Sequence, residues 1–215
     1  YPYCDGGIML CNERWRKSLQ DFKAQISDWL THPSKDSMIW FATFADAHYV
    51  CGDQALLNEL MQHTQQTRMA NNFLNRFAAA TLQFGDTSTF WAKWLGMNDS
   101  DIDLKKAGIF PIVHGVRSLA LEHHIAHTST RTRLDTLAQL GVMNAKDAQN
   151  LKEALDFFLS KRLAVSLVTA DRAARKVNPH TLSALEKDVL KESLLVVKNF
   201  KQFITHHFRL DIFGV

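Results

Sequence analysis

The stretch DIDLKKAGIFPIVHGVRSLALEHH, residues 101–124, decides what kind of fold this chain can adopt. It opens with two acidic residues and two lysines, and Gly108 is expected to break the chain before a helix begins at Pro111. Proline suits the first helical position because the N–H that it lacks would have no partner there. Helical spacing then separates an apolar face from a second face. The apolar face carries Ile112, Val116, Leu119, Ala120 and His123, and the second face carries His114, Arg117, Leu121 and His124.

The second face of this expected helix has two interpretations. A histidine and an arginine one turn apart, closely preceded by Lys105 and Lys106, form a surface that could face an anion near a helix N-terminus. The same residues also suit an ordinary solvated helix face behind a loop, and residue types alone favour this second interpretation.

The composition indicates an ordinary globular protein and argues against an all-β fold. Apolar residues make up 46% and charged residues 22%, an ordinary globular balance. With only 9 Gly and 4 Pro, the chain has few of the residues that the tight turns of an all-β protein require. A net charge of +3 does not indicate nucleic-acid binding by itself.

The cysteines and the apolar runs favour a reduced, cytoplasmic protein. Cys4, Cys11 and Cys51 are odd in number and lack the spacing of a metal site, so a disulfide framework is not expected. The longest apolar run, residues 38–51, is too short to span a bilayer, and no signal peptide is recognisable. We expect no membrane partner. Since the chain begins at Tyr1 rather than Met, we expect a piece of a longer protein.

Periodicity predicts several helices before the central stretch. Asn12 is the expected cap of a helix that Pro33 ends, and Asp53 is the expected cap of one long helix or two closely joined ones up to Phe84. Residues 34–50 are apolar nearly all round, so both helix and strand remain open, with helix favoured by length. Residues 1–11 are expected to include a short extended segment. Residues 85–103 form a looser connector with core anchors at Trp91, Trp94 and Leu95.

Three further helices are expected after the central stretch. A short helix should end at Gly141, and Asn144 should cap a long one. Asn178-Pro179 breaks the chain, and Ser183 with Glu186 predicts a capping box that starts the last helix. The expected inward-facing residues of these helices are Leu151, Leu155, Phe158, Leu159, Val189, Val196, Phe200 and Phe203. Together the patterns predict an all-α, multi-helix bundle of about seven or eight helices.

Several catalytic motifs are absent from the sequence. His123, His124 and His127 spell HHxxH, and His206 and His207 form a pair, but the glutamate-centred HExxH is missing, so we expect no metal ligands. No GxSxG elbow and no Gly-rich phosphate loop occurs.

Charged residues elsewhere suggest two weaker candidates. Arg131 with Arg133, and Arg172 with Arg175 and Lys176, are the most basic patches, and both are better explained as solvated helix ends. We therefore expect no nucleic-acid partner. Asp46 and His48 lie in apolar surroundings, where they could form a buried hydrogen-bonded pair or line a site.

Three stretches together resemble a known family. They are YPYCDGGIMLCNERW (residues 1–15), FADAHYVCGD (residues 44–53) and the central stretch, and NPHTLSALEKDVLKESL (residues 178–194) fits as well. They look like the C-terminal part of bacterial predicted nucleotidyltransferases in which a cyclic-nucleotide-binding domain and a CBS pair precede the nucleotidyltransferase core. Those proteins end in a helical domain described as substrate-binding. The resemblance covers nearly the whole chain.

The resemblance implies roles for a few residues. The family is similar to nitrogen-signalling uridylyltransferases and glutamine synthetase adenylyltransferases, in which a lysine and a Gly-Gly-(Leu/Ile)-Arg turn open a helix beside the nucleotide site. Lys105 and Arg117 are the positions that could bind phosphate or substrate here, although their spacing differs. His114 would orient a neighbour, and Asp46 would face the cleft beside the core. Family members have Asp-Phe-Arg where this chain has Asp46-Ala47-His48, so an arginine is replaced by a titratable histidine.

The resemblance also sets the expected function. We expect residues 1–52 to be the tail of the nucleotidyltransferase core region with the first helices, and residues 53–215 to be the helical substrate-binding domain. No Gly-Ser turn followed by Asp-x-Asp occurs in the chain, so no residue in it is expected to catalyse transfer alone. Mg²⁺ and a nucleoside triphosphate are expected for the intact enzyme.

The implied partners are the upstream core, the regulatory domains and an acceptor of unknown identity, for which a signalling protein is a candidate. The alternative is a helical interaction or dimerisation module of a cyclic-nucleotide/CBS signalling protein, without nucleotide contact.

Overall fold

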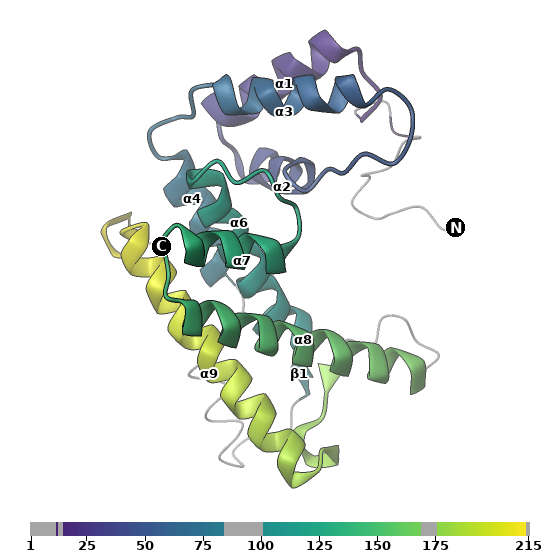
Figure 1. The fold of residues 1–215 in the computed structure, drawn as a ribbon, viewed down its shortest axis with the longest axis vertical. Coiled ribbons are helices and arrows are strands. Elements are labelled where there is room, and N and C mark those ends of the chain that lie inside the picture. The colour runs from purple at the N-terminus through teal and green to yellow at the C-terminus, as the bar shows by residue number, and fades with distance from the viewer. Residues whose placement is uncertain (1–11, 13–14, 84–100, 169–175, 214–215) are drawn as a thin grey trace. The chain divides into compact units, whose positions relative to one another are not determined.

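The computed structural model describes residue 12 and residues 15–83, 101–168 and 176–213, and it confirms an all-α fold (Figure 1). The described residues form two compact units, Tyr1–Phe73 and Leu74–Val215. The α-helices are α1 (Leu19–Thr31), α2 (Lys35–Phe44), α3 (Gln54–Gln66), α4 (Phe73–Ala79), α6 (Phe110–Glu122), α7 (Thr130–Gln139), α8 (Ala145–Val168) and α9 (Ala184–His207). The shorter elements are η2 (Ala80–Leu82), β1 (Ile102–Asp103), η4 (Lys105–Ile109), β2 (Lys176–Val177), η5 (Pro179–Thr181) and η6 (Leu210–Phe213).

The N-terminal unit packs α1 against α2 and α3 around aromatic side chains. Ring contacts link Trp15, Phe22, Trp29, Trp40, Phe41, Phe44 and Phe73. The prediction that Asn12 caps the first helix is wrong. Ser18 is the cap, because its hydroxyl accepts from the Asp21 N–H, whereas the Asn12 carbonyl accepts from the Trp15 N–H in a preceding turn.

The two open questions in this half have definite answers. Residues 35–44 are helical, with Ser34 as the cap in a capping box, so the strand alternative is wrong. The chain between Asp53 and Gln83 contains two α-helices, α3 and α4, and Asp53 caps the first as predicted. No glycine or proline separates them. Instead the Ala70 N–H donates to the Leu30 carbonyl at 2.9 Å, which is a tertiary bond that continuous helix would forbid.

Helix α6 is the centre of the C-terminal unit. It contacts α7, η4, η2 and α9, and eight of its side chains or backbone positions are buried: Pro111, Ile112, His114, Gly115, Val116, Ser118, Leu119 and Ala120. Helix α8 packs on both α7 and α9. A Cβ on Gly115 would lie 2.6 Å from the Phe200 ring of α9, so glycine is what allows this helix to approach so closely.

The predicted break at Gly108 is wrong. Residues 105–109 form the π-helix η4, which runs directly into α6. Gly108 is needed for packing, since a Cβ there would lie 2.5 Å from the Phe158 ring of α8. Pro111 lies just inside α6, where its ring would crowd the carbonyl one turn earlier, and the wider π turn relieves that crowding.

The later helix ends follow the predicted caps. Gly141 has φ of +71° just beyond α7, and the Asp147 N–H donates to the Asn144 side chain at the start of α8. Ser183 and Glu186 form the capping box of α9. Two predicted core residues are wrong, because Leu159 is 45% and Val189 is 39% exposed. The two-stranded antiparallel pairing of β1 with β2 was not predicted.

Other predicted features lie outside the described residues. These are the extended segment within residues 1–11 and the anchors Trp91, Trp94 and Leu95. Among the described helices, none combines the length and the apolar character needed to cross a bilayer.

Candidate functional site

The N-terminal end of the η4–α6 helix presents two lysine side chains to solvent. Lys105 and Lys106 are both exposed. Their backbone N–H groups donate to the Asp103 carboxylate at 3.0 and 3.1 Å. Because Asp103 already occupies these two backbone donors, an anion at this end would be held by the lysine side chains.

His114 is buried rather than placed on an open surface. It is 4% exposed and lies between two rings, with ring-centre distances of 4.6 Å to Phe77 and 5.2 Å to Phe110. Its Nε2 lies 2.7 Å from the Phe77 carbonyl, and its Nδ1 lies 3.3 Å from Nη1 of Arg117. A carbonyl can only accept and a guanidinium can only donate, so the two bonds together require a neutral imidazole with its proton on Nε2.

Arg117 is half-buried and is oriented by His114. The orienting role of His114 toward a substrate-binding neighbour stays a prediction. Lys105 and Arg117 lie about three turns apart on one continuous helix, or roughly 18 Å along its axis. A ligand that contacted both would have to extend along the helix, so a single phosphate group is a poor fit for the pair.

Asp46 and His48 follow the end of α2 and do not form a buried pair. Asp46 is half-buried in a turn where its N–H lies 3.4 Å from the Thr43 carbonyl, and His48 is exposed. Asp46 belongs to the N-terminal unit, whereas Lys105, His114 and Arg117 belong to the C-terminal unit. The cleft-facing role of Asp46 stays a prediction.

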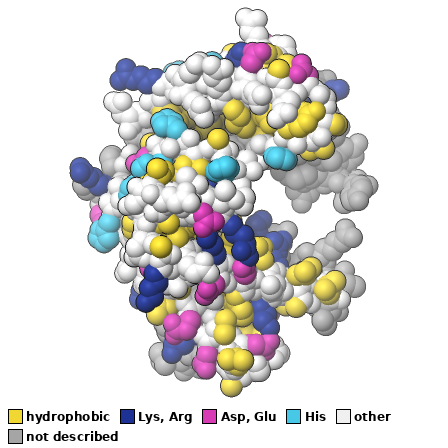
Figure 2. All heavy atoms as spheres, viewed as in Figure 1, with side chains coloured by type: hydrophobic (Ala, Val, Ile, Leu, Met, Phe, Trp, Pro, Cys, Tyr) yellow, Lys and Arg dark blue, Asp and Glu magenta, His cyan; other side chains and the backbone are white. Residues whose placement is uncertain are grey.

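The first basic patch contacts its own fold. Arg133 is 3% exposed and its Nε–H donates to the His127 carbonyl at 2.5 Å, while Arg131 forms an ion pair with Asp156 of α8. Figure 2 shows basic and acidic side chains close together on this face. Further ion pairs join Lys152 to Asp135 and Lys161 to Glu186. Arg172 and Arg175 lie outside the described residues, and Lys176 is exposed in β2.

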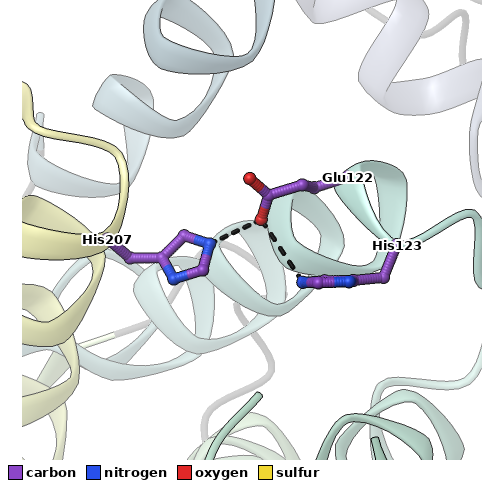
Figure 3. A group of neighbouring side chains, drawn as sticks. All are labelled: Glu122, His123 and His207. Atoms are coloured by element: carbon purple, nitrogen blue, oxygen red, sulfur yellow. Dashed lines mark hydrogen bonds and ion pairs between the residues drawn. The ribbon is translucent and has the colours of Figure 1, made fainter.

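The histidine-rich stretch forms a cluster that the sequence did not predict. Helix α6 ends at Glu122, so His123, His124 and His127 do not share a helical face as HHxxH would require. Instead, His123 lies near Glu122 and near His207 of α9, and the ligand atoms of these three side chains all lie within 4.8 Å of one another (Figure 3). The signal in the sequence is weak: each pair of histidines stands at the end of a predicted helix.

The described residues offer little that resembles the metal site of a nucleotidyltransferase core. Asp101 and Asp103 do spell Asp-x-Asp, but no Gly-Ser turn precedes them, and the Asp103 carboxylate caps η4. Among described residues, the converging group of three metal-ligating side chains contains one carboxylate, Glu122. Since phosphoryl chemistry on Mg²⁺ needs paired carboxylates, these residues do not fit the ion, and we derive no transfer step from them.

Cys51 is an exposed free thiol.

The described residues form a helical bundle, and comparison with protein families shows to which class of domain it belongs. The model described as "Putative nucleotidyltransferase substrate binding domain" matches residues 71–208, and the one described as "Putative nucleotidyltransferase DUF294" matches residues 1–36. The first match covers more than half of the chain, which therefore belongs to this nucleotidyltransferase-associated substrate-binding family. No curated protein and no solved structure gives a significant match.

Proposed function

We propose that the C-terminal unit binds the substrate of a nucleotidyltransferase that transfers a nucleotidyl group from a nucleoside triphosphate, with Mg²⁺, to an acceptor. The single observation that carries the proposal is the family match over residues 71–208. In this proposal the acceptor is a protein of a signalling pathway, and cyclic-nucleotide-binding and CBS domains regulate the enzyme in the cytoplasm. The described residues supply binding groups, and the catalytic carboxylates belong to the core.

Three residues of the η4–α6 helix are proposed to contact or position the substrate. Lys105 offers an exposed ammonium group for a phosphate. Arg117 offers a guanidinium that stays charged at any working pH and can bind an anion through two N–H groups. His114 is a positioning residue, because its neutral ring accepts a hydrogen bond from Arg117. The extended spacing of Lys105 and Arg117 suits a nucleotide that lies along the helix with its phosphates at one end.

Calorimetric titration with ATP and UTP, on the chain and on the intact enzyme, tests these contacts. Lys105→Ala and Arg117→Ala should each weaken nucleotide binding at least tenfold, the usual scale for losing a charge-assisted hydrogen bond of about 1.5–3 kcal/mol. Lys106→Ala is the matched control for Lys105, since it removes a neighbouring exposed lysine. Binding that is equal in wild type, Lys105→Ala and Arg117→Ala would remove both residues from the site.

His114→Phe separates positioning from contact. It keeps an aromatic ring between Phe77 and Phe110 but removes the acceptor for Arg117. We expect His114→Phe to stay folded and to bind nucleotide more weakly than wild type does. In an Arg117→Ala background, the same substitution should cause no further loss of nucleotide affinity. An additive loss in the double variant would show that His114 does not act through Arg117.

An exposed apolar surface favours a second candidate function, a dimerisation module without nucleotide contact. The surface consists of Leu159, Leu163 and Leu167 on α8, which are 45%, 60% and 77% exposed. Leucines at i, i+4 and i+8 form one continuous strip of a helix. The apparent mass on a sizing column distinguishes the two functions. A mass that rises with concentration in wild type but not in Leu163→Glu favours dimerisation. A constant monomer whose melting temperature rises with ATP or UTP favours the first function.

A further inference from the structure

The C-terminal ends of α6 and α9 meet at three side chains that can bind a metal ion. Glu122 is the last residue of α6, His123 is its C-cap, and His207 is the last residue of α9. Figure 3 shows the Glu122 carboxylate between the two imidazole rings. Its Oε2 lies 2.5 Å from Nε2 of His207 and 3.5 Å from Nε2 of His123.

These distances are close to those of a four-coordinate zinc site. Zinc binds histidine nitrogen and carboxylate oxygen at about 2.0–2.2 Å, so tetrahedral ligand atoms lie about 3.3 Å apart. The three ligand atoms here all lie within 4.8 Å of one another, so side-chain shifts of roughly 1 Å would bring them to that spacing. Two histidines and one glutamate with an open fourth position are a donor set that zinc accepts.

The electrostatic surroundings favour a cation. The carbonyl ends of two helices, each equivalent to about half a negative charge, lie near this place, because Glu122 and His207 are the last residues of α6 and α9. The Glu122 carboxylate adds a full negative charge when it is ionised. A divalent ion would compensate all three.

The surroundings also hold the ligands in place while leaving the site open. The His207 ring packs against Phe203 and Phe208, with ring-centre distances of 5.6 and 4.8 Å. The side chains of Glu122, His123 and His207 are 31%, 33% and 25% exposed, so an ion from solvent can reach them.

We propose that Glu122, His123 and His207 form a binding site for a first-row divalent cation of the Zn²⁺ class. The ion would link the ends of α6 and α9, and water or an acidic group of a ligand would take the fourth position. Binding would displace any proton on the two Nε2 atoms, because only the deprotonated nitrogens can bind the metal. This site is independent of the proposed nucleotide contacts at Lys105 and Arg117.

Titration with Zn²⁺ and Co²⁺ tests the site on the full chain, purified without a histidine tag and stripped with a chelator. We expect one equivalent of Zn²⁺ by calorimetry, and cobalt absorption bands of the intensity typical of four-coordinate sites. At a hundred times its dissociation constant, Zn²⁺ should raise the melting temperature by roughly 5–10 °C.

Single substitutions separate this site from adventitious binding by surface histidines. His123→Ala and His207→Ala should each weaken binding at least tenfold, and Glu122→Gln should weaken it through loss of the charge. His124→Ala and His206→Ala are the matched controls, since each removes the adjacent histidine outside the cluster, and both should bind as wild type does. Circular dichroism of each metal-free variant checks that it folds.

Three outcomes would overturn the proposal. The first is a wild-type chain that binds neither ion, and the second is metal binding that survives in His207→Ala. The third is a loss of metal affinity in His124→Ala and His206→Ala as large as the loss in His123→Ala and His207→Ala. If His207→Ala does not fold, Glu122→Gln and the wild-type cobalt spectrum decide between a metal site and a hydrogen-bonded cluster. Six-coordinate cobalt bands would also count against the site.

Discussion

A carboxylate lies near each end of helix α9, Glu186 of α9 at the N-terminal end and Glu122 of α6 at the C-terminal end. The two carboxylates lie in opposite electrostatic surroundings. At the N-terminal end, Glu186 accepts a hydrogen bond from the Ser183 N–H at 2.8 Å and pairs with Lys161 of α8. The pairing with Lys161 is the largest of the causes that lower the pKa of Glu186 from 4.5 to about 2. At the C-terminal end, the nearby carboxylate is Glu122 of α6, whose partners are His123 and His207.

The difference concerns how the charge at each end is compensated: within the fold at one end and, in our proposal, by a metal ion at the other. A negative charge in the first turn of a helix is stabilised by the helix dipole, so Glu186 lies in a favourable place without any outside ion. Glu122 lies where two helices end, and there both dipoles disfavour a negative charge. The proposed metal ion would compensate this charge.

Helix α9 connects the two ends, and its packing against α6 depends most on Phe200. Its ring is 4% exposed in the middle of α9 and lies over Gly115 of α6. Phe200→Ala should lower the free energy of unfolding by about 3–5 kcal/mol, because it removes buried apolar contacts and leaves a cavity.

Phe203→Ala is the matched control in urea denaturation, since Phe203 is only half-buried three residues further along α9. Phe203→Ala should lower the free energy of unfolding clearly less than Phe200→Ala does. Equal losses in the two variants would mean that the middle of α9 is not packed as described.

Gly115→Ala tests the same contact from the α6 side. The added methyl would lie 2.6 Å from the Phe200 ring, so we expect a loss of about 1–3 kcal/mol from overpacking. An alanine in an open helix position would instead gain up to about 1 kcal/mol over glycine. Thermal unfolding should also show that the loss shrinks or reverses in a Phe200→Ala background. A loss of the same size in both backgrounds would contradict the contact.

The two ends also show what the sequence could and could not predict. The capping box of Ser183 and Glu186, like the caps at Asn144 and Gly141, is set within one turn of chain, so local spacing was enough. Glu122 and His207 are 85 residues apart, and no local pattern brings them together.

The wrong predictions for Gly108 and His114 have the same physical origin. Gly108 was predicted to be a break because glycine often ends helices. Glycine is needed there instead because a side chain would collide with the Phe158 ring of a distant helix. His114 was assigned to an open face because periodicity placed it opposite the apolar stripe. Phe77 of α4 and Phe110 cover it, and the spacing within α6 contains no information about α4. Packing between distant elements decided each case.

Glu122→Gln tests the role of the Glu122 charge at the C-terminal end of α9. The amide oxygen can still accept the hydrogen bond from His207, so in chelator the free energy of unfolding should change by less than about 1 kcal/mol, the usual range for an exposed ion pair. With Zn²⁺ present, wild type should become more stable than the variant. Urea denaturation in chelator and in Zn²⁺ measures both differences, and a large loss in chelator would show that the Glu122 carboxylate stabilises the fold without any metal ion.

Glu186→Gln should have the smallest effect, because glutamine can still complete the capping box and only the charge facing Lys161 is lost. Its effect should depend on pH. The pKa of Glu186 is lowered in the folded chain, so its charge stabilises the fold above the unfolded value of 4.5, and this contribution disappears as the pH falls toward about 2. Thermal unfolding from pH 7 to pH 2 should therefore show wild type above Glu186→Gln at neutral pH, with the two curves converging below pH 4.5. A gap that stays constant down to pH 2 would mean that the Lys161 pair does not hold the N-terminal end of α9, and the contrast between its two ends would then lack a charge basis.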